Sequence, residues 1–156
     1  MESVYIETSV VSYLVATPSR DAVTAWRQQL TRDWWSDQRA KFACVTSQGV
    51  IDEVKEGDST TAAKRVAALQ SVSLISGGPE SITLAGDFLA RGLFPTNAQA
   101  DANHLATAIC GEVDYLLTWN YRHLANAVVL HGLEKFLKTR GLSLPRVCTP
   151  EELMAE

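Results

Sequence analysis

Three carboxylates and one amide in this 156-residue chain come from four separate segments and carry oxygen atoms that could bind a cation. Glu7 comes directly after an apolar run that is typical of a strand, and Asn120 stands just beyond another. Glu53 and Asp101 each lie within an expected helix, next to apolar side chains. Oxygen donors of this kind, without Cys or paired His ligands, suit Mg²⁺ or Mn²⁺ better than zinc. The four residues therefore predict a divalent-cation site, provided that the fold brings them together.

Asp101 shares one helix face with Leu105 and Ala108, so that a charge interrupts an otherwise apolar stripe. Burying a charge is costly unless a partner compensates it, and a metal ion would do so. The other candidates have simpler alternatives. Glu53 could be an ordinary surface acid of its helix, and Asn120 could simply stabilise a turn.

Runs rich in β-branched and aromatic residues alternate with helical patterns along the chain. The expected strands are residues 4–6, 42–46, 72–75, 115–118 and a last one around Val147. Helices are expected at residues 21–39, 81–91 and 126–139, after Ser47, around Asp101, and from Thr149. This alternation predicts an α/β fold, a three-layer α/β/α sandwich with a central, mostly parallel sheet. Residues 1–156 are expected to form one domain because no repeat or linker interrupts them.

The carboxyl ends of the strands are where open parallel sheets bind ligands. Glu7 sits at such an end, where a carboxylate is expected to be too exposed to belong to the core. Asp114 precedes its strand and is therefore assigned to the opposite edge of the sheet, outside the site. Asp52 points about 100° away from Glu53 around their helix, so it is excluded as well.

The composition is that of a globular protein, with 46% hydrophobic and 21% charged residues. No apolar run approaches the roughly 20 residues that cross a bilayer, so no membrane association is expected. Three widely separated cysteines favour a reducing cytoplasm over a disulfide or zinc site. The net charge of −4 argues against nucleic-acid binding over the whole surface. Five Lys and Arg against one Glu between residues 121 and 146 could still contact phosphates locally, or could form a solvated helix face.

Four motifs occur in order along the chain. They are a strand followed by E-T-S at Glu7, T-S-x-x-V-x-x-E-V around Glu53, A-D-A-x-H-L-A-T-A around Asp101, and D-Y-L-L-T-x-N ending at Asn120. This series resembles the PIN-domain nucleases, and particularly the VapC-like toxins of prokaryotic toxin–antitoxin pairs, over nearly the whole chain. The resemblance implies a Mg²⁺- or Mn²⁺-dependent endoribonuclease. Glu7 and Asn120 depart from the family pattern, because aspartate is usual at the first position and frequent at the second.

The resemblance also implies a role for each residue. Glu7 and Asp101 would hold the metal directly, and Glu53 would position or deprotonate the attacking water. Asn120 would orient that water or bind the metal, although its lack of charge should weaken the hold on a second cation. The hydroxyls expected to hydrogen-bond the carboxylates belong to Thr8, Ser9 and Thr118.

Three further polar residues lie close to these motifs. Arg122 is near enough to reach a substrate phosphate from the rim of the site. His123 is expected to be a surface residue at a helix start, and His104 a packed, hydrogen-bonded histidine without a ligand role.

The predicted function is hydrolysis of RNA phosphodiester bonds by a homodimeric toxin that an antitoxin protein inhibits. An antitoxin arginine placed in the site would neutralise the same carboxylates that bind the metal. Because Glu7 and Asn120 both depart from the family pattern, the alternative is a domain that only binds RNA or a protein. A phosphotransfer domain would need an aspartate nucleophile after an early strand, which Glu7 replaces poorly.

Overall fold

A five-stranded sheet forms the centre of the molecule in the computed structural model, which describes residues 1–154. Its strands run in the order β3-β2-β1-β4-β5, and every neighbouring pair is parallel. The strands are β1 (Ser3–Ile6), β2 (Ala43–Thr46), β3 (Ser73–Leu74), β4 (Tyr115–Leu117) and β5 (Arg146–Cys148). In the central strand, Val4, Tyr5 and Ile6 are fully buried, as expected for a parallel strand covered on both faces.

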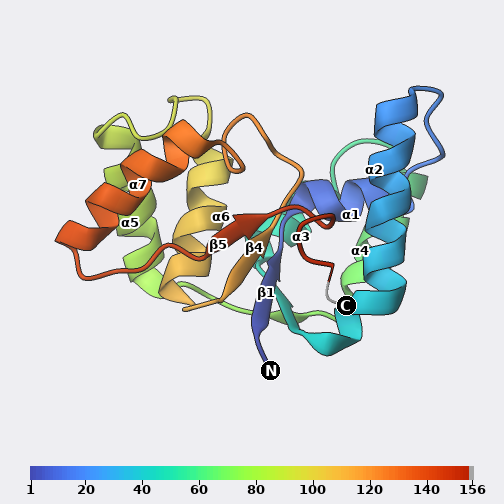
Figure 1. Cartoon of the computed structure of the whole chain (residues 1–156), viewed down its shortest axis with the longest axis horizontal. Coiled ribbons are helices and arrows are strands. Elements are labelled where there is room, and N and C mark those ends of the chain that lie inside the picture. Colours follow the sequence, from blue (N-terminus) through green and yellow to red (C-terminus); the bar gives the residue numbers. More distant parts are fainter. Residues whose placement is uncertain (155–156) are drawn as a thin grey trace.

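Helices cover both faces of the sheet and complete the predicted three-layer sandwich (Figure 1). On one side lie α1 (Thr8–Val15), α2 (Ala22–Asp33), α3 (Gln48–Val54) and α4 (Ser59–Leu69). On the other side lie α5 (Gly78–Ala90), α6 (Gln99–Cys110) and α7 (Ala127–Thr139). The chain leaves β1 towards β2 and leaves β4 towards β5, so the direction of the winding reverses between β1 and β4. Open α/β sheets bind ligands at the carboxyl ends of strands at such a reversal.

The register brings the carboxyl ends of three strands to one level. The Glu7 amide donates to the Leu117 carbonyl at 3.2 Å, and the Thr46 hydroxyl donates to the Ile6 carbonyl at 3.0 Å. At the opposite edge, the Asp114 carboxylate accepts the Ser3 amide at 2.7 Å. The structure thus places Asp114 away from the other acids, as the strand direction predicted.

Two predicted helices differ from the structure. The helix predicted over residues 21–39 ends its regular part at Asp33 and continues as a π-helical turn over Trp34–Gln38. There Trp34 is fully buried and donates its indole N–H to the Leu153 carbonyl at 3.1 Å. The irregular turn therefore lies where the Trp34 ring packs into the core. The helix predicted from Thr149 is a single turn, closed by the Leu153 amide and the Thr149 carbonyl at 3.1 Å.

Helices α1 and α4 have no counterpart among the predicted elements. The sequence of α1, T-S-V-V-S-Y-L-V, is rich in β-branched residues that disfavour helices in isolation. Glu7 caps this helix, and Val10 and Val11 are buried against the core, so capping and tertiary packing outweigh local propensity. None of the helices between residues 1 and 154 has the length and apolar character needed to span a bilayer.

Candidate active site

Glu7 lies at the end of β1 and is buried, with 4% of its surface exposed, which corrects the expectation of an exposed carboxylate. It is buried because it serves as the N-cap of α1, where Oε2 accepts the Ser9 amide at 2.6 Å. The Thr118 hydroxyl donates to Oε1 at 2.9 Å. Burial raises the pKa of the Glu7 carboxyl, and the Ser9 and Thr118 hydrogen bonds and the charge of His104 oppose that rise without cancelling it. A charged Glu7 is therefore costly, and a bound cation would lower that cost.

Glu53 projects from α3 and is held by two donors. The Thr8 hydroxyl donates to its Oε1 at 2.9 Å, and Nε2 of the buried His104 contacts the same oxygen. On the other side of the imidazole, Nδ1 lies 2.9 Å from the Tyr5 hydroxyl, which lies 2.6 Å from Oγ of Ser47. A chain of polar groups thus connects the cap of α3 with the candidate base.

The charges of this pair follow from its surroundings. Burial alone would lower the pKa of His104, but its hydrogen bond to Glu53 and the charges of Glu53, Glu7 and Asp101 raise it. Burial likewise opposes ionisation of Glu53, yet His104 holds the pKa of that carboxyl below its usual range. With His104 charged, Nε2–H donates to Glu53 and Nδ1–H donates to Tyr5, which can then donate to Ser47.

Asp101 lies in the first turn of α6 and is 19% exposed at its side chain. Its Oδ1 accepts the side-chain N–H of Asn120 at 3.0 Å, and its Oδ2 lies 2.8 Å from Nδ1 of His123. The side-chain oxygen of Asn120 in turn accepts the His123 amide at 3.0 Å. Asn120 therefore closes the turn after β4 and also fixes one oxygen of Asp101.

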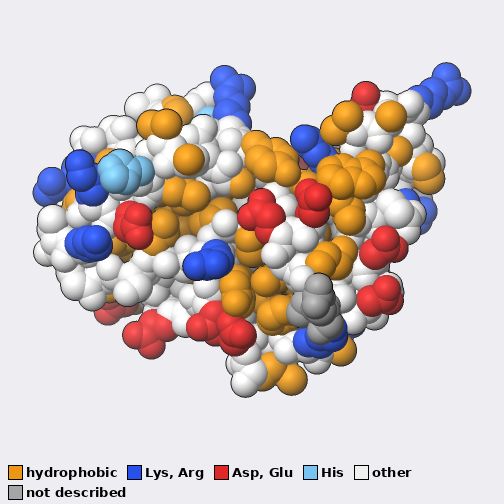
Figure 2. Space-filling model, in the orientation of Figure 1, with side chains coloured by type: hydrophobic (Ala, Val, Ile, Leu, Met, Phe, Trp, Pro, Cys, Tyr) orange, Lys and Arg blue, Asp and Glu red, His pale blue; other side chains and the backbone are white. Residues whose placement is uncertain are grey.

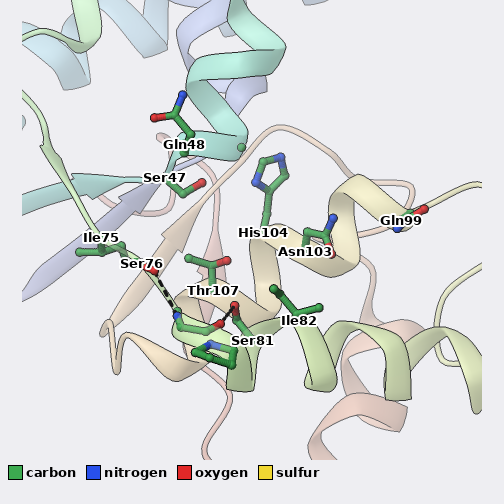
Figure 3. Close-up of a pocket in the computed structure, with 14 residues that line it drawn as sticks. Ser47, Gln48, Ile75, Ser76, Ser81, Ile82, Gln99, Asn103, His104 and Thr107 are labelled. Carbon is green, nitrogen blue, oxygen red and sulfur yellow. Dashed lines mark hydrogen bonds between the residues drawn. The ribbon is translucent and has the colours of Figure 1, made fainter.

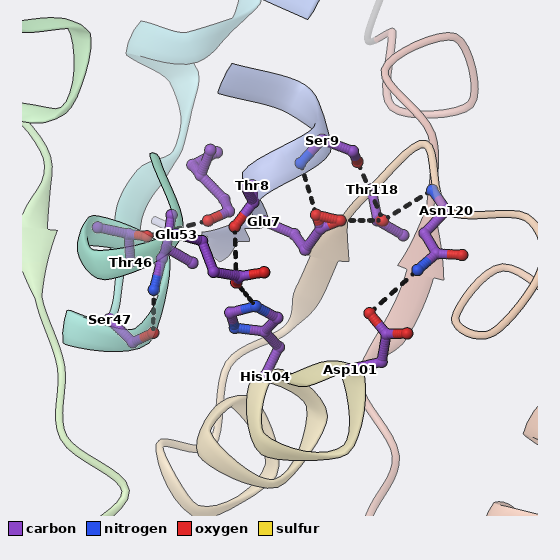
Figure 4. A network of polar contacts seen from close by, with 12 residues as sticks. Glu7, Thr8, Ser9, Thr46, Ser47, Glu53, Asp101, His104, Thr118 and Asn120 are labelled. Carbon is purple, nitrogen blue, oxygen red and sulfur yellow. Dashed lines mark hydrogen bonds and ion pairs between the residues drawn. The ribbon is translucent and has the colours of Figure 1, made fainter. Parts of the chain in front are cut away.

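Two groups of hydrogen bonds hold these residues at one edge of the sheet (Figure 4). One group holds Glu53 through Thr8 and His104. In the other, Thr118 connects Glu7 with Asn120, because its hydroxyl donates to Glu7 and accepts the Asn120 amide at 3.0 Å. Ser9 supports Thr118 and accepts the Trp119 amide at 2.8 Å. The fold thus brings all four predicted residues to one region, and the hydroxyls of Thr8 and Thr118 hydrogen-bond two of the carboxylates.

The donor set fits a hard divalent cation chemically, because it consists of three carboxylates and one amide oxygen. The side chains are nevertheless paired with protein donors rather than directed at one point. Within residues 1–154, no group of three His, Cys, Asp or Glu side chains has the arrangement needed to hold a metal ion. Metal binding would therefore require small rearrangements in which carboxylate oxygens exchange protein donors for the ion.

His123 has a different environment from the one its sequence position predicted. It lies in a turn before α7 rather than at a helix start, and its side chain is only 17% exposed, against Asp101. The sequence contained one indication of this position. His123 follows Asn120 by three residues, and an asparagine side chain often accepts a backbone N–H of the turn that follows it. Arg122 is exposed, and its reach to a substrate phosphate stays a prediction.

Replacing Tyr5 by phenylalanine should destabilise the protein by about 1–3 kcal/mol, because it leaves the buried Nδ1 of His104 without a partner. Urea denaturation of Tyr5→Phe should show a lower midpoint with an unchanged slope. Tyr13→Phe is the matched control, because Tyr13 packs against Trp119 by its ring alone, with no hydroxyl contact among the hydrogen bonds of residues 1–154. Equal stability of the two variants would show that the Tyr5 hydroxyl is dispensable.

The parallel sandwich, with acidic side chains at the carboxyl edge of its sheet, is a PIN-like α/β/α fold. Several solved chains share it, including the following two. VapC20 of Mycobacterium tuberculosis, a sarcin-ricin loop cleaving toxin, is 17% identical with a TM-score of 0.58, over 76% of this chain and 91% of that one. VapBC2 of Rickettsia felis, solved with a DNA fragment from its promoter, is 12% identical with a TM-score of 0.53, over 94% and 98%. No family model matches the sequence, and no curated protein matches it. At these identities the likeness establishes the fold.

Proposed function

We propose that the protein is a Mg²⁺- or Mn²⁺-dependent endoribonuclease and the toxin of a toxin–antitoxin pair. The observation that carries the proposal is the convergence of Glu7, Glu53 and Asp101, from three separate segments, at the point where the sheet reverses its winding. The burial of Glu7 supports it, because burial raises the pKa of that carboxyl and a bound cation would favour its charged form. The fold shared with VapC20, a toxin that cleaves the sarcin-ricin loop, adds support.

In this proposal each residue takes the role that the resemblance implied for it. Asp101 and Glu7 would hold the ion, assisted by the Asn120 oxygen, and the bound ion would supply an acidified water and positive charge beside the phosphate. Glu53, kept ionised by His104, would accept a proton from the attacking water. Arg122, exposed beside the site, would contact the phosphate backbone of the RNA.

The proposal includes a protein partner. The similarity to VapBC2 favours an antitoxin that covers the acidic site, and we propose that the toxin is a homodimer. An arginine from the antitoxin could pair with Asp101 or Glu53 in place of the histidines that now contact them.

Cleavage of a structured RNA with and without Mn²⁺ tests the proposed function. We expect products with new ends at defined positions in the presence of Mn²⁺, and none after addition of EDTA. Metal-independent cleavage, or no cleavage by folded protein at any tested Mn²⁺ concentration, would reject it.

One observation favours a second function, that of an RNA- or protein-binding module without catalysis. All three carboxylates already have protein donors, and two of them pair with a histidine, so the site is compensated without a metal. RNA binding that survives EDTA, combined with absent cleavage, would identify this alternative.

Substitution of Asn120 by aspartate should increase metal binding. The Asn120 side-chain N–H now donates to Asp101 at 3.0 Å, and a carboxylate there would repel Asp101 unless a cation lay between them. Calorimetric titration with Mn²⁺ should show a second bound ion, or an affinity roughly tenfold higher or more. Gln70→Glu, which adds the same charge at an exposed position, should leave binding unchanged. Unaltered stoichiometry and affinity in Asn120→Asp would contradict this interpretation of position 120.

A further inference from the structure

A pocket of about 580 Å³ adjoins the acidic site on the side of β2 and β3 (Figure 3). Its walls come from the start of α3, from the connection between β3 and α5, from the first turns of α5, and from α6. Gly77 ends this connection and Gly78 begins α5. A Cβ on Gly77 would lie 2.4 Å from Cβ of Ser81, and Gly78 has a φ of +68°, so the backbone itself shapes the wall.

His104 belongs to both the pocket and the acidic site. It lines the pocket, and its Nε2 contacts Glu53. Ser47, which closes the chain of contacts through Tyr5, also lines the pocket. A molecule in the pocket would therefore lie next to the residue proposed to activate water.

The chemistry of the walls selects the kind of ligand. Both ring nitrogens of His104 are already paired, with Glu53 and with Tyr5, and the other lining residues carry no ionisable side chain. Neither a phosphate nor a metal ion would therefore find an unpaired charged partner there. The polar groups include three amides, from Gln48, Gln99 and Asn103. In the hydrogen bonds among residues 1–154, Gln48 is paired with Asp52, whereas Gln99 and Asn103 have no side-chain partner. Apolar surface is supplied by Ile75, Pro79 and Ile82, the last of which is 76% exposed.

We propose that this pocket binds an unpaired base of the RNA, at a nucleotide next to the cleaved phosphodiester bond. A nucleobase is a neutral, planar group. The donors and acceptors on its edge can pair with amide side chains, which carry both, and its faces can pack against apolar side chains. Because the pocket joins the acidic site through His104, the base it accepts would determine where the RNA is cut. This inference rests on the proposed function and adds a substrate requirement to it.

Gly49 offers a selective way to fill the pocket. A Cβ at this position would lie 3.6 Å from Oγ of Ser47 and 3.7 Å from Cε1 of His104, both ordinary contacts, so a side chain can start there without strain. The larger side chain of Gly49→Leu would then occupy the pocket. Gly86→Leu is the matched control, because Gly86 is another exposed helical glycine with nothing within 4 Å of its Cβ. Asn103→Ala removes an exposed, unpaired amide and serves as a second test if Gly49→Leu fails to fold.

The first readout is the set of cut positions on one long RNA in the presence of Mn²⁺. We expect wild type and Gly86→Leu to share a base preference beside the cut. In Gly49→Leu, cleavage efficiency should fall roughly tenfold or more and that preference should disappear, while Asn103→Ala should weaken it. Retained efficiency and preference in Gly49→Leu, while wild type cuts normally, would overturn the pocket assignment and leave the proposed nuclease intact.

The second readout does not depend on catalysis. Titration of the ¹⁵N-labelled protein with each of the four nucleoside 3′-monophosphates, in EDTA, should shift the amides of Gly49, Gly77 and Gly78. The shifts should remain in Gly86→Leu and vanish at Gly77 and Gly78 in Gly49→Leu. Absence of shifts with all four nucleotides would overturn the base-binding proposal, whether or not the protein cleaves RNA.

Discussion

Replacing Asp101 by asparagine is expected to abolish metal-dependent RNA cleavage while the protein stays folded. The new amide keeps the shape of the side chain and can still accept a hydrogen bond from Asn120, but it no longer offers a charged oxygen to an ion. We expect a loss of at least about a hundredfold in cleavage rate, as for removal of a preorganised charge-stabilising group. Initial rates with Mn²⁺ on one RNA, together with circular dichroism, measure both effects.

Asp114→Asn is the matched control for this substitution. Asp114 lies at the opposite edge of the sheet, where it accepts the amide and hydroxyl of Ser3. Its replacement should cost some stability and leave the cleavage rate per folded molecule unchanged. If Asp101→Asn cleaves as fast as wild type, the activity comes from another site or from a contaminant.

Replacing Glu7 by glutamine is expected to stabilise the protein and to inactivate it. Glutamine can accept the Ser9 amide, and its own N–H can donate to Thr118, so the cap is preserved without a buried charge. In EDTA at neutral pH we expect a gain on the order of 1–3 kcal/mol in the free energy of unfolding, the cost of burying an imperfectly compensated polar group. Cleavage should fall by at least about a hundredfold.

The pH dependence distinguishes this explanation from a general effect of charge. Because the pKa of Glu7 is raised in the folded protein, its contribution to stability is present at low pH and is lost as pH rises through that pKa. The advantage of Glu7→Gln over wild type should therefore grow as the pH rises above the ordinary pKa of a glutamate. Glu134→Gln, at an exposed position of α7, should show no such trend. A glutamine variant less stable than wild type at neutral pH would mean that the charged carboxylate is itself favourable.

The fold could be predicted from the sequence because its strands are short apolar runs and most helices have a clear apolar face. Parallel strands joined by helices restrict the topology strongly, since crossover connections have one hand. Helix α1 was not predicted because its β-branched residues favour strands. Burial and the cap that Glu7 provides, directly after β1, stabilise the helix instead. The end of α2 could not be predicted either, because Trp34 there contacts Leu153, which lies 119 positions away in the sequence.

For the candidate site, the sequence predicted which segments of the chain converge. Loops and helix starts gather at the carboxyl edge of a parallel sheet, which is why Glu7, after a strand, could be grouped in advance with Glu53 and Asp101, in early turns of helices. The sequence could not show how they are compensated. The contact of His123 with Asp101 depends on the turn that Asn120 makes, and the contact of His104 with Glu53 joins two helices. Glu7 was expected to be exposed because its capping of α1 could not be foreseen.

Calorimetric titration of the intact, folded protein with Mn²⁺ tests the central claim most directly, because every proposed catalytic step requires the acids to share an ion. We predict that wild type binds one ion with measurable affinity, and that Asp101→Asn binds it at least roughly tenfold more weakly. Absence of Mn²⁺ binding by wild type, or equal binding by Asp101→Asn, would contradict the claim that these carboxylates form a metal site.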